Sequence, residues 1–426
     1  MIKVIMKSAN DIILYAFCLL TILTGCKDTR QMSLLIIAAE AEEDYKLDDE
    51  QRIIVRNGND FSVELFKKIA ENAGEENVFI STIGMFYSLN IINNGASGHT
   101  RQEVCTVLNM DTTDVKRINE FCRRLMIGQS KVIEDNFFGS SSYMRIATLF
   151  QVGAHIDIRK SFQKILEHDY FAGIIKGDVD STLQSKIDRW CTEQTEGLLR
   201  DFPIKQVDDK SANLIVANYF IGRWLQEFDK ESTKEEPFYG GISSTVDMMN
   251  KTERERVFAY TKLDEFSLLS IPYVGGYQLY IILPNKIDGL ASLLQSLDGE
   301  MLISAMRQLK SYDRIHTKIP KFQINYSFMA KKYLESLGVS KIFSNTSELN
   351  RIHSEPMKID DIIQNTKVIL DEDGTRAGAI TSTSFATLSE TMNPTEAYFY
   401  ADHPFVYVVQ DPFGNYCFMG TFWGQS

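Results

Sequence analysis

The segment between Leu370 and Phe405 constrains the fold more than any other part of this 426-residue chain. Connections longer than about 15 residues are uncommon in compact domains and are usually functional or disordered. Side chains alternate between the two faces of a strand. Every second residue from Thr375 to Phe385 is uncharged, so this face of the segment could be buried in a sheet without burying a charge. A flexible loop of small residues is the alternative, but it needs no such pattern. The uncharged set is Thr375, Ala377, Ala379, Thr381, Thr383 and Phe385, and Arg376 lies in the intervening set.

The predicted elements are segregated along the chain, with helices early and strands late. Asp60 can cap a helix that carries a regular apolar face. The apolar run 78–92 predicts a short strand followed by a buried helix. Later runs predict strands over 212–224, 277–283, 405–409 and 416–423, the last two forming a hairpin. This order favours a single mixed α+β domain.

Residues 1–26 have the layout of a cleaved signal peptide. Lys3 and Lys7 precede an apolar run over 12–23, which is too short for a comfortable membrane span. The alternative is an uncleaved membrane anchor. A cleaved signal predicts a secreted, extracellular protein without a membrane span.

Residues 27–58 are polar and then acidic, which predicts a disordered arm ahead of a domain over 59–426. Tyr45 lies among acidic residues and is a candidate for sulfation. The arm is either an acidic ligand for a basic surface on a partner or a solubilising tail.

Composition and motifs argue against several classes of function. The net charge of −12 disfavours nucleic-acid binding, because duplex affinity comes mostly from phosphate neutralisation. No local signature of a hydrolase, metalloprotease or nucleotide-binding enzyme occurs, and the six histidines lack metal-ligand spacing. We therefore predict neither an enzyme nor a metal site. An enzyme would need a spatial Ser-His-Asp arrangement that no motif indicates.

Four cysteines follow the predicted signal segment, and three sequons occur. The cysteines allow one disulfide or free buried thiols, and their spacing selects no pair. In a secreted chain, the sequon asparagines Asn250, Asn325 and Asn345 are candidate glycosylation sites.

The hinge Glu372-Asp373-Gly374-Thr375-x-Ala377-Gly378-Ala379 resembles the reactive-loop hinge of inhibitory serpins. His403-Pro404-Phe405 with Phe418-Met419-Gly420 resembles the C-terminal signature of that family. The segments that begin at Asn77 and at Asn218 resemble two further serpin motifs in the same order. The resemblance covers about residues 60–424. It implies the serpin fold: three β-sheets surrounded by eight to nine helices, with an exposed reactive-centre loop.

Within the family, the chain is most similar to heparin cofactor II-like plasma serpins. This resemblance rests on the acidic arm around Tyr45, on Gly84, and on the run that begins Ile271-Pro272-Tyr273.

The resemblance implies a monomeric serine-protease inhibitor that acts as a suicide substrate and inserts its cleaved loop into the central sheet. Counting from the hinge glycine by the spacing usual in the family places the reactive bond at Leu388–Ser389; because the segment after Leu388 is longer than usual, Phe385 and Met392 are alternative cleavage positions. Leu388 suits chymotrypsin-like proteases, whereas a thrombin-like target would need the acidic arm to supply affinity. The alternative is a non-inhibitory serpin that acts as a hormone carrier, peptide-hormone precursor or chaperone.

The resemblance also implies residues that support these roles. Heparin or another sulfated glycosaminoglycan is the expected activator, with no other cofactor. Gln364 stands where a histidine commonly bonds beneath the sheet in this family. The candidate heparin-binding residues are Lys116, Arg117, Arg123, Arg124 and Lys131, of which Arg117, Arg124 and Lys131 could share one face of a helix; the alternative is an ordinary solvated face. The candidate residues that control opening of the sheet are Ser81, Asn218, Trp224 and Gln364.

Overall fold

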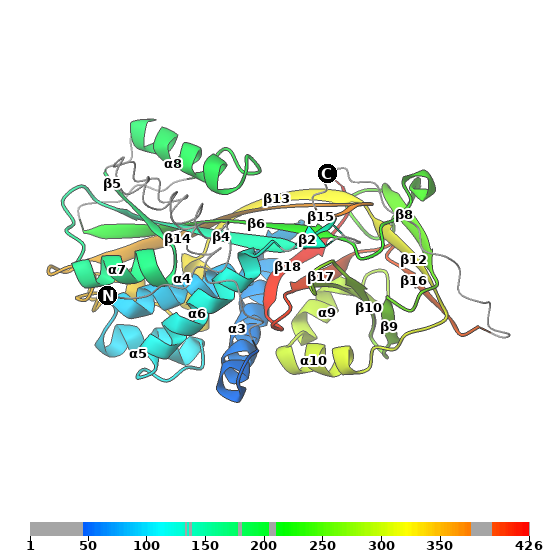
Figure 1. Ribbon diagram of the computed structural model, residues 1–426, viewed down its shortest axis with the longest axis horizontal. Coiled ribbons are helices and arrows are strands. Elements are labelled where there is room, and N and C mark those ends of the chain that lie inside the picture. Colours follow the sequence, from blue (N-terminus) through cyan, green and yellow to red (C-terminus); the bar gives the residue numbers. More distant parts are fainter. Residues whose placement is uncertain are drawn as a thin grey trace, which may run out of the picture. The chain divides into compact units, whose positions relative to one another are not determined.

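Nine α-helices and three main β-sheets form the part of the chain that the computed structural model describes (Figure 1). That part comprises residues 46–132, 134–135, 139–177, 181–203, 210–375 and 394–425, all within the compact unit Glu43–Ser426. The helices are α3 (Asp49–Ala73), α4 (Thr82–Gly95), α5 (Gly98–Val107), α6 (Val115–Ser130), α7 (Lys160–Asp169), α8 (Ser181–Gln194), α9 (Leu290–Ser296), α10 (Gly299–Arg307) and α11 (Lys331–Leu337), with short 3₁₀ turns at Lys230–Ser232 and Lys341–Phe343.

The central sheet has the strand order β13-β14-β15-β6-β4-β5. Its strands are β13 (Phe322–Met329), β14 (Lys358–Asp371), β15 (Gly374–Thr375), β6 (Ser211–Arg223), β4 (Tyr143–Val152) and β5 (Gly173–Lys176). A second six-stranded sheet has the order β1 (Val78–Ile80), β18 (Tyr416–Phe422), β17 (Phe405–Gln410), β11 (Gln278–Pro284), β10 (Phe266–Pro272) and β9 (Ala259–Lys262).

A four-stranded sheet completes the three. Its order is β16 (Glu396–Tyr400), β12 (Arg314–Pro320), β8 (Thr245–Glu253) and β7 (Lys234–Pro237). A two-stranded ribbon joins β2 (Glu134–Asp135) to β3 (Gly139–Ser140). The predicted α+β class and the three-sheet architecture are confirmed.

The central sheet is covered on both faces, which explains why every residue of β6 from Ser211 to Phe220 is buried. In Figure 1, α8 lies on one side of the sheet, and α4, α6 and α7 lie on the other. Leu183, Ile187 and Cys191 of α8 pack against Ile215 of β6 in a cluster separate from the main core. A strand buried on both faces shows no polar–apolar alternation.

Most elements predicted from the sequence are present with small shifts at their ends. The apolar run 78–92 forms β1 and α4, and the run 212–224 forms β6. The C-terminal hairpin pairs β17 with β18. The four cysteines that the structure describes are unpaired and buried, which is the second of the two expected alternatives. Among the described residues, no helix is long and apolar enough to cross a membrane.

The predicted start of helical order is wrong. Helix α3 begins at Asp49, so residues 49–58, assigned to a disordered arm, are helical. Asp48 is the N-cap: its side chain accepts from Gln51 N, and the Gln51 side chain accepts from Asp48 N. This capping box, together with burial of Val55, stabilises the extra turns. Asp60, predicted as the cap, lies inside the helix.

Candidate functional site

At one end of the central sheet, Gly374 and Thr375 separate β14 from β6. These two residues lie near the start of the long loop, which is the segment between Asp371 and β16. Strands β14 and β6 pair in parallel as far as Thr366 and Asn218. Beyond that point β15 lies between them and pairs antiparallel with both. Because β15 runs back toward the paired region, a strand continuing from Thr375 would extend between β14 and β6. We call this position the insertion slot.

Only glycine fits the first position of β15. The φ angle of Gly374 is +145°, which side-chain-bearing residues rarely adopt. A Cβ atom on Gly374 would lie 2.0 Å from the carbonyl oxygen of Gly222 on β6. The close approach of these two backbones therefore depends on the missing side chain.

Thr375 points into the protein and is 2% exposed. Its hydroxyl lies 2.6 Å from the hydroxyl of Tyr273. The Tyr273 ring stacks on Trp224 at 4.3 Å, and Trp224 Nε1 donates to the carbonyl of Asp371 at 2.9 Å. Thr375, the first member of the uncharged set, is thus already buried at the entrance of the slot, where a charge would lack a partner.

Glu372 fixes the turn that precedes β15. Its carboxylate accepts from Thr233 Oγ1 at 2.8 Å and from Lys321 Nζ at 2.9 Å. Burial alone would raise the pKa of Glu372, but the bonds from Lys321, Thr233 and the backbone outweigh it and lower the pKa. The turn is therefore tied to the sheet by an ionised carboxylate.

Gln364 fastens β14 to the segment that links β1 to α4. Its amide oxygen accepts from Ser81 N at 2.7 Å, and its amide nitrogen donates to Ser81 O at 2.9 Å. Ser81 Oγ caps α4 by accepting from Gly84 N at 3.2 Å. Both Gln364 and Ser81 are fully buried, so the pair satisfies backbone groups that water cannot reach.

Asn218 on β6 lies at the same level of the insertion slot but is not fastened in this way. Neither polar atom of its buried amide has a hydrogen-bond partner among the described residues. The amide packs against Gly84, where a Cβ atom would lie 2.4 Å from Asn218 Nδ2. The β14 side of the slot is therefore bonded to the helical layer, and the β6 side is held there by packing.

Asp313 fixes the other end of the long loop. Its carboxylate accepts from Thr395 N and Thr395 Oγ1, both at 2.8 Å, just before β16. The bond from Arg256, together with those from Thr395, lowers the pKa of Asp313 to about 2. The loop is thus held at Thr375 in one sheet and at Thr395 beside another.

The family profile of serpins, described as serine protease inhibitors, matches residues 56–424. The chain belongs to the serpin family. A monkeypox virus protein named serine proteinase inhibitor 2 is 29% identical over 369 residues, which cover 84% of this chain and 98% of the viral protein. Serpin-Z10 of Arabidopsis thaliana is 28% identical over 391 residues, which cover 86% of this chain and 96% of the plant protein.

Solved serpin structures share the fold. Native tengpin, a thermophilic serpin, superposes with a TM-score of 0.76 at 23% identity, covering 90% of this chain and 96% of tengpin. Serpin48 of the insect Tenebrio molitor gives the same TM-score and identity, covering 90% of this chain and 100% of Serpin48. These relatives do not single out the heparin cofactor II-like group, so that finer resemblance stays a prediction.

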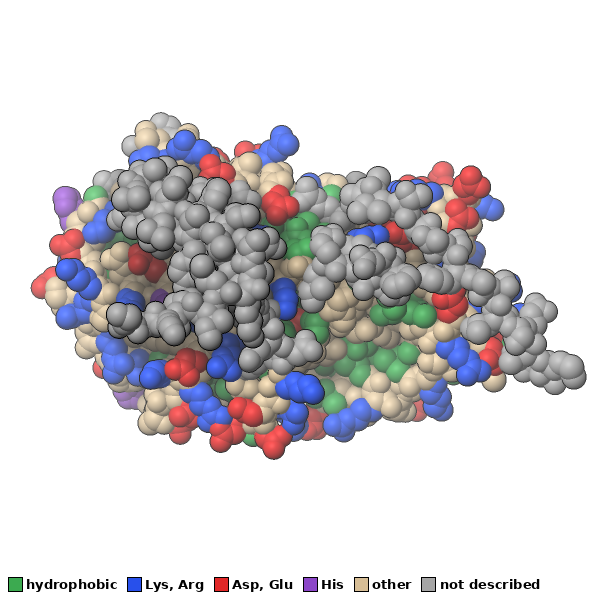
Figure 2. All heavy atoms as spheres, in the orientation of Figure 1, with side chains coloured by type: hydrophobic (Ala, Val, Ile, Leu, Met, Phe, Trp, Pro, Cys, Tyr) green, Lys and Arg blue, Asp and Glu red, His purple; other side chains and the backbone are tan. Residues whose placement is uncertain are grey.

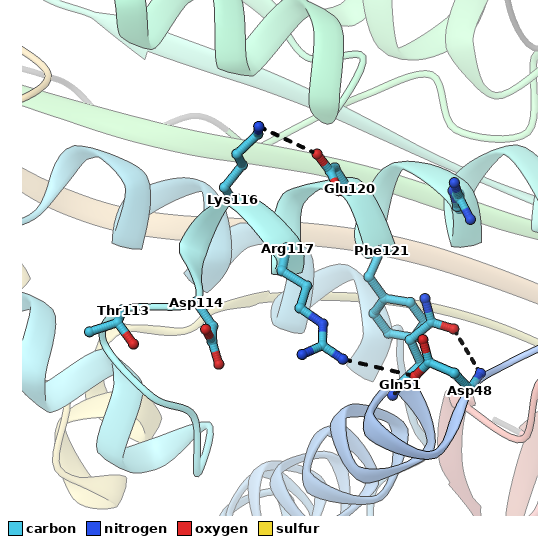
Figure 3. A pocket seen from close by; sticks show the side chains of 9 residues that line it. Asp48, Gln51, Thr113, Asp114, Lys116, Arg117, Glu120 and Phe121 are labelled. Carbon is cyan, nitrogen blue, oxygen red and sulfur yellow. Dashed lines mark hydrogen bonds and ion pairs between the residues drawn. The ribbon is translucent and has the colours of Figure 1, made fainter.

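Three of the five candidate heparin-binding residues of this serpin come together on α6. Lys116, Arg117 and Arg124 line a groove of about 520 Å³ between α6 and the start of α3 (Figure 3). Arg117 forms ion pairs with Glu50 and Asp48, and Lys116 approaches Glu120 at 4.0 Å. The groove thus has cationic and anionic walls.

Arg123 does not belong to this surface, and its assignment there is wrong. It is 9% exposed, donates to the carbonyl of His168, and its guanidinium lies 4.9 Å from the centre of the Phe171 ring. One helical position turns a side chain by about 100°, so Arg123 and Arg124 face different neighbours. Lys131 lies just past the end of α6 and does not line the groove.

The sequons lie in three different environments. Asn250 is in β8, where its Nδ2 donates to Glu236, Ser232 and Met248, so a glycan there would displace three hydrogen bonds. Asn325 on the edge strand β13 and Asn345 in a loop are exposed. Solvent access therefore favours the last two as glycan sites.

The other predicted site residues lie outside the described part of the chain. They are Tyr45, Ala377, Gly378, Ala379, Leu388 and Ser389. The structure also adds contacts that the sequence did not predict. Tyr273, Lys321 and Thr233 hold the hinge from distant parts of the chain, and no local motif marks them. For Tyr273 alone, the sequence held an indication, because the residue lies in the run Ile271-Pro272-Tyr273 that resembles heparin cofactor II-like serpins.

We expect replacement of Glu372 by alanine to lower the free energy of unfolding by about 1–3 kcal/mol at pH 7, because a charge-assisted anchor is lost. Since the native pKa of Glu372 is lowered, this stabilisation is complete above the usual glutamate pKa and is lost as the pH falls through the lower native value. Urea unfolding at pH 7, 5, 4 and 3 should show the deficit shrinking with acidity. Exposed Glu335→Ala is the control, and a deficit independent of pH would contradict the prediction.

Replacement of Gln364 by alanine should leave Ser81 N–H and C=O buried without partners, at a cost of about 1–3 kcal/mol for each group. We expect a lower melting temperature and faster hydrogen exchange at the β1–α4 junction than in the control Gln323→Ala, an exposed glutamine on β13. Equal stability of the two variants would show that the Gln364–Ser81 bonds contribute nothing.

Proposed function

We propose that this serpin is a secreted inhibitor that traps a serine protease by inserting its cleaved loop into the central sheet. The observation that carries the proposal is β15, whose two residues already occupy the entrance of the insertion slot. The relatives named serine proteinase inhibitor 2 support it. The signal-like segment 1–26 supports the secreted part of the proposal.

The reaction begins as ordinary proteolysis. The serine hydroxyl of the protease attacks the carbonyl carbon of Leu388, the bond to Ser389 N breaks, and the new amine takes the proton. Cleavage frees the segment after Thr375 from its tether at Thr395. That segment then enters the slot with the protease still esterified to Leu388, and dislocation of the protease halts deacylation.

Backbone pairing supplies a driving force for insertion. Without the new strand, β14 and β6 share one parallel ladder below the slot entrance. With it, two antiparallel ladders replace that one, and antiparallel pairing is slightly more stable per residue. The uninserted state then persists because opening the sheet is slow, not because it is the most stable arrangement.

The residues around the reactive bond favour an apolar specificity pocket. No lysine or arginine occurs between Ala377 and Asp402, and Leu388 precedes the predicted bond. A chymotrypsin-like protease is therefore the direct target. A thrombin-like target would need additional affinity from the acidic residues ahead of α3.

The groove on α6 supports activation by a sulfated glycosaminoglycan. Sulfates would compete with Glu50 and Asp48 for Arg117 and would recruit Arg124 and Lys116. On the face drawn in Figure 2, coloured Lys and Arg side chains are interspersed with Asp and Glu, so the proposal rests on this groove and not on a broad basic surface.

A non-inhibitory role as hormone carrier, peptide-hormone precursor or chaperone is the second candidate. Human thyroxine-binding globulin has a TM-score of 0.76, but at 18% identity this shows the shared fold alone. The small uncharged residues that follow Gly374 favour the inhibitory role, because a carrier needs no insertable loop.

Incubation with chymotrypsin should give an SDS-stable complex and release the fragment beginning at Ser389, as judged by denaturing gels and mass spectrometry. Thr375→Arg should be cleaved without complex, because a charge cannot enter the position that Thr375 occupies at 2% exposure. Arg376→Gln is the control and should still form the complex, because Arg376 belongs to the intervening set and should point outward on insertion. Clean cleavage of the unaltered protein without complex would favour the carrier or precursor role.

Heparin should accelerate inhibition of thrombin, and Arg117→Gln combined with Arg124→Gln should reduce the ratio of rates with and without heparin by about tenfold, equivalent to about 1.4 kcal/mol. Exposed Lys286→Gln, on the loop before α9, should keep the full ratio. An unchanged ratio in the double variant would place any heparin site elsewhere.

A further inference from the structure

Strand β16 presents two tyrosines at an open sheet edge. It is the terminal strand of the four-stranded sheet and pairs in parallel with β12. Ala397 and Phe399 point into the core, whereas Tyr398 is 54% exposed and Tyr400 is 39% exposed. The centres of the two rings lie 6.1 Å apart, and aromatic side chains are enriched at protein interfaces relative to the rest of the surface.

Neighbouring side chains hold both rings in place. His316 on β12 stacks on Tyr398 with centroids 4.7 Å apart, and the Tyr398 hydroxyl donates to Glu396 at 2.9 Å. Lys318 Nζ lies 5.4 Å from the centre of the Tyr400 ring. A partner would therefore lose little side-chain entropy in binding them.

The charged side chains around Tyr398 and Tyr400 form ion pairs with one another. Arg314 pairs with Glu396 at 3.1 Å, and Lys318 pairs with Glu236 of β7. The face therefore offers two aromatic rings framed by paired charges. It suits an uncharged, apolar partner surface better than a strongly charged one.

The position of β16 identifies the partner. The chain between Ser389 and Tyr398 can span at most about 30 Å when fully extended. A protease domain of about 230 residues has a radius of gyration of about 17 Å and is therefore about 45 Å across. Such a protease extends about 22 Å from its centre, and Thr395 lies at most about 20 Å from Ser389, so a protease whose active site holds the Leu388–Ser389 bond reaches the start of β16. The Asp313–Thr395 bonds fix the start of that strand.

We propose that Tyr398 and Tyr400, with His316, form a docking surface for an apolar rim of the target protease, beside the part of its cleft that receives the residues after the cleaved bond. This inference rests on the proposed function, because it assumes that a protease engages the loop. The docking surface would stabilise the encounter complex between serpin and protease, before any insertion. It would add affinity to that of Leu388 for the specificity pocket of the protease.

The test measures docking without the trap. Chymotrypsin and thrombin, each with the active-site serine replaced by alanine, bind the loop but cannot cleave it. We expect Tyr398→Ala and Tyr400→Ala each to raise the Kd for at least one of these proteases at least tenfold, by surface plasmon resonance. Because the charges on the face are paired, that ratio should be the same at low and high salt. Met329→Ala, a 42% exposed side chain on β13, is the matched control and should stay within twofold.

The outcomes separate this proposal from the proposed function. If active chymotrypsin forms SDS-stable complexes but the tyrosine variants bind the inactive proteases normally, docking is wrong and the trap stands. If no complex forms yet binding still depends on the tyrosines, docking stands without the trap. If Tyr398→Ala only turns a dimer into a monomer by light scattering, the face joins two copies of this chain, and the proposal is overturned. Tyr398→Phe and thermal melting guard against misfolding, since the ring and its stacking remain in that variant.

Discussion

The parallel ladder between β14 and β6 is the interaction on which the rest of this structure depends. It ends at Thr366 and Asn218, and Gly374 and Thr375 occupy the space beyond it. The loop that begins at β15 can pair antiparallel with both strands. A longer inserted strand would therefore replace the single parallel ladder with two antiparallel ladders. The Gln364–Ser81 bonds hold one of these strands to the helices below, so in the proposed mechanism they would oppose opening of the sheet.

In the proposed mechanism, the two anchored ends of the loop explain why cleavage would come before insertion. One end is fixed by Glu372 through Lys321 and Thr233, and the other by Asp313 through Thr395. An intact loop cannot advance far down the slot while Thr395 stays beside β12. Once the chain is cut, only the first anchor matters, and that anchor directs Thr375 inward.

Sequence patterns predicted those parts of the site that depend on local chemistry. Alternation of uncharged residues predicted that one face of the segment could be buried if it became a strand, and Thr375, the first of these residues, is already buried. The hinge glycine occupies a φ that only glycine adopts readily. The fold class followed from the order of apolar runs. Patterns did not predict Lys321 or Thr233 as partners of Glu372, because those contacts join segments 51 and 139 residues away, and nothing local marks them.

The two errors in the prediction have one physical origin. An acidic run was taken to be disordered, yet Asp48 caps α3, and both Asp48 and Glu50 of the first turn pair with Arg117. All five basic residues were candidates for heparin binding, yet Arg123 is buried against Phe171 while Arg117 and Arg124 line the groove. In both cases the outcome depended on how a helix arranges charged residues at its end and around its axis. The same geometry makes the groove bipolar, and a polyanion entering it must displace carboxylates that already hold the start of α3, so its binding would loosen that helix end as well as occupy Arg117.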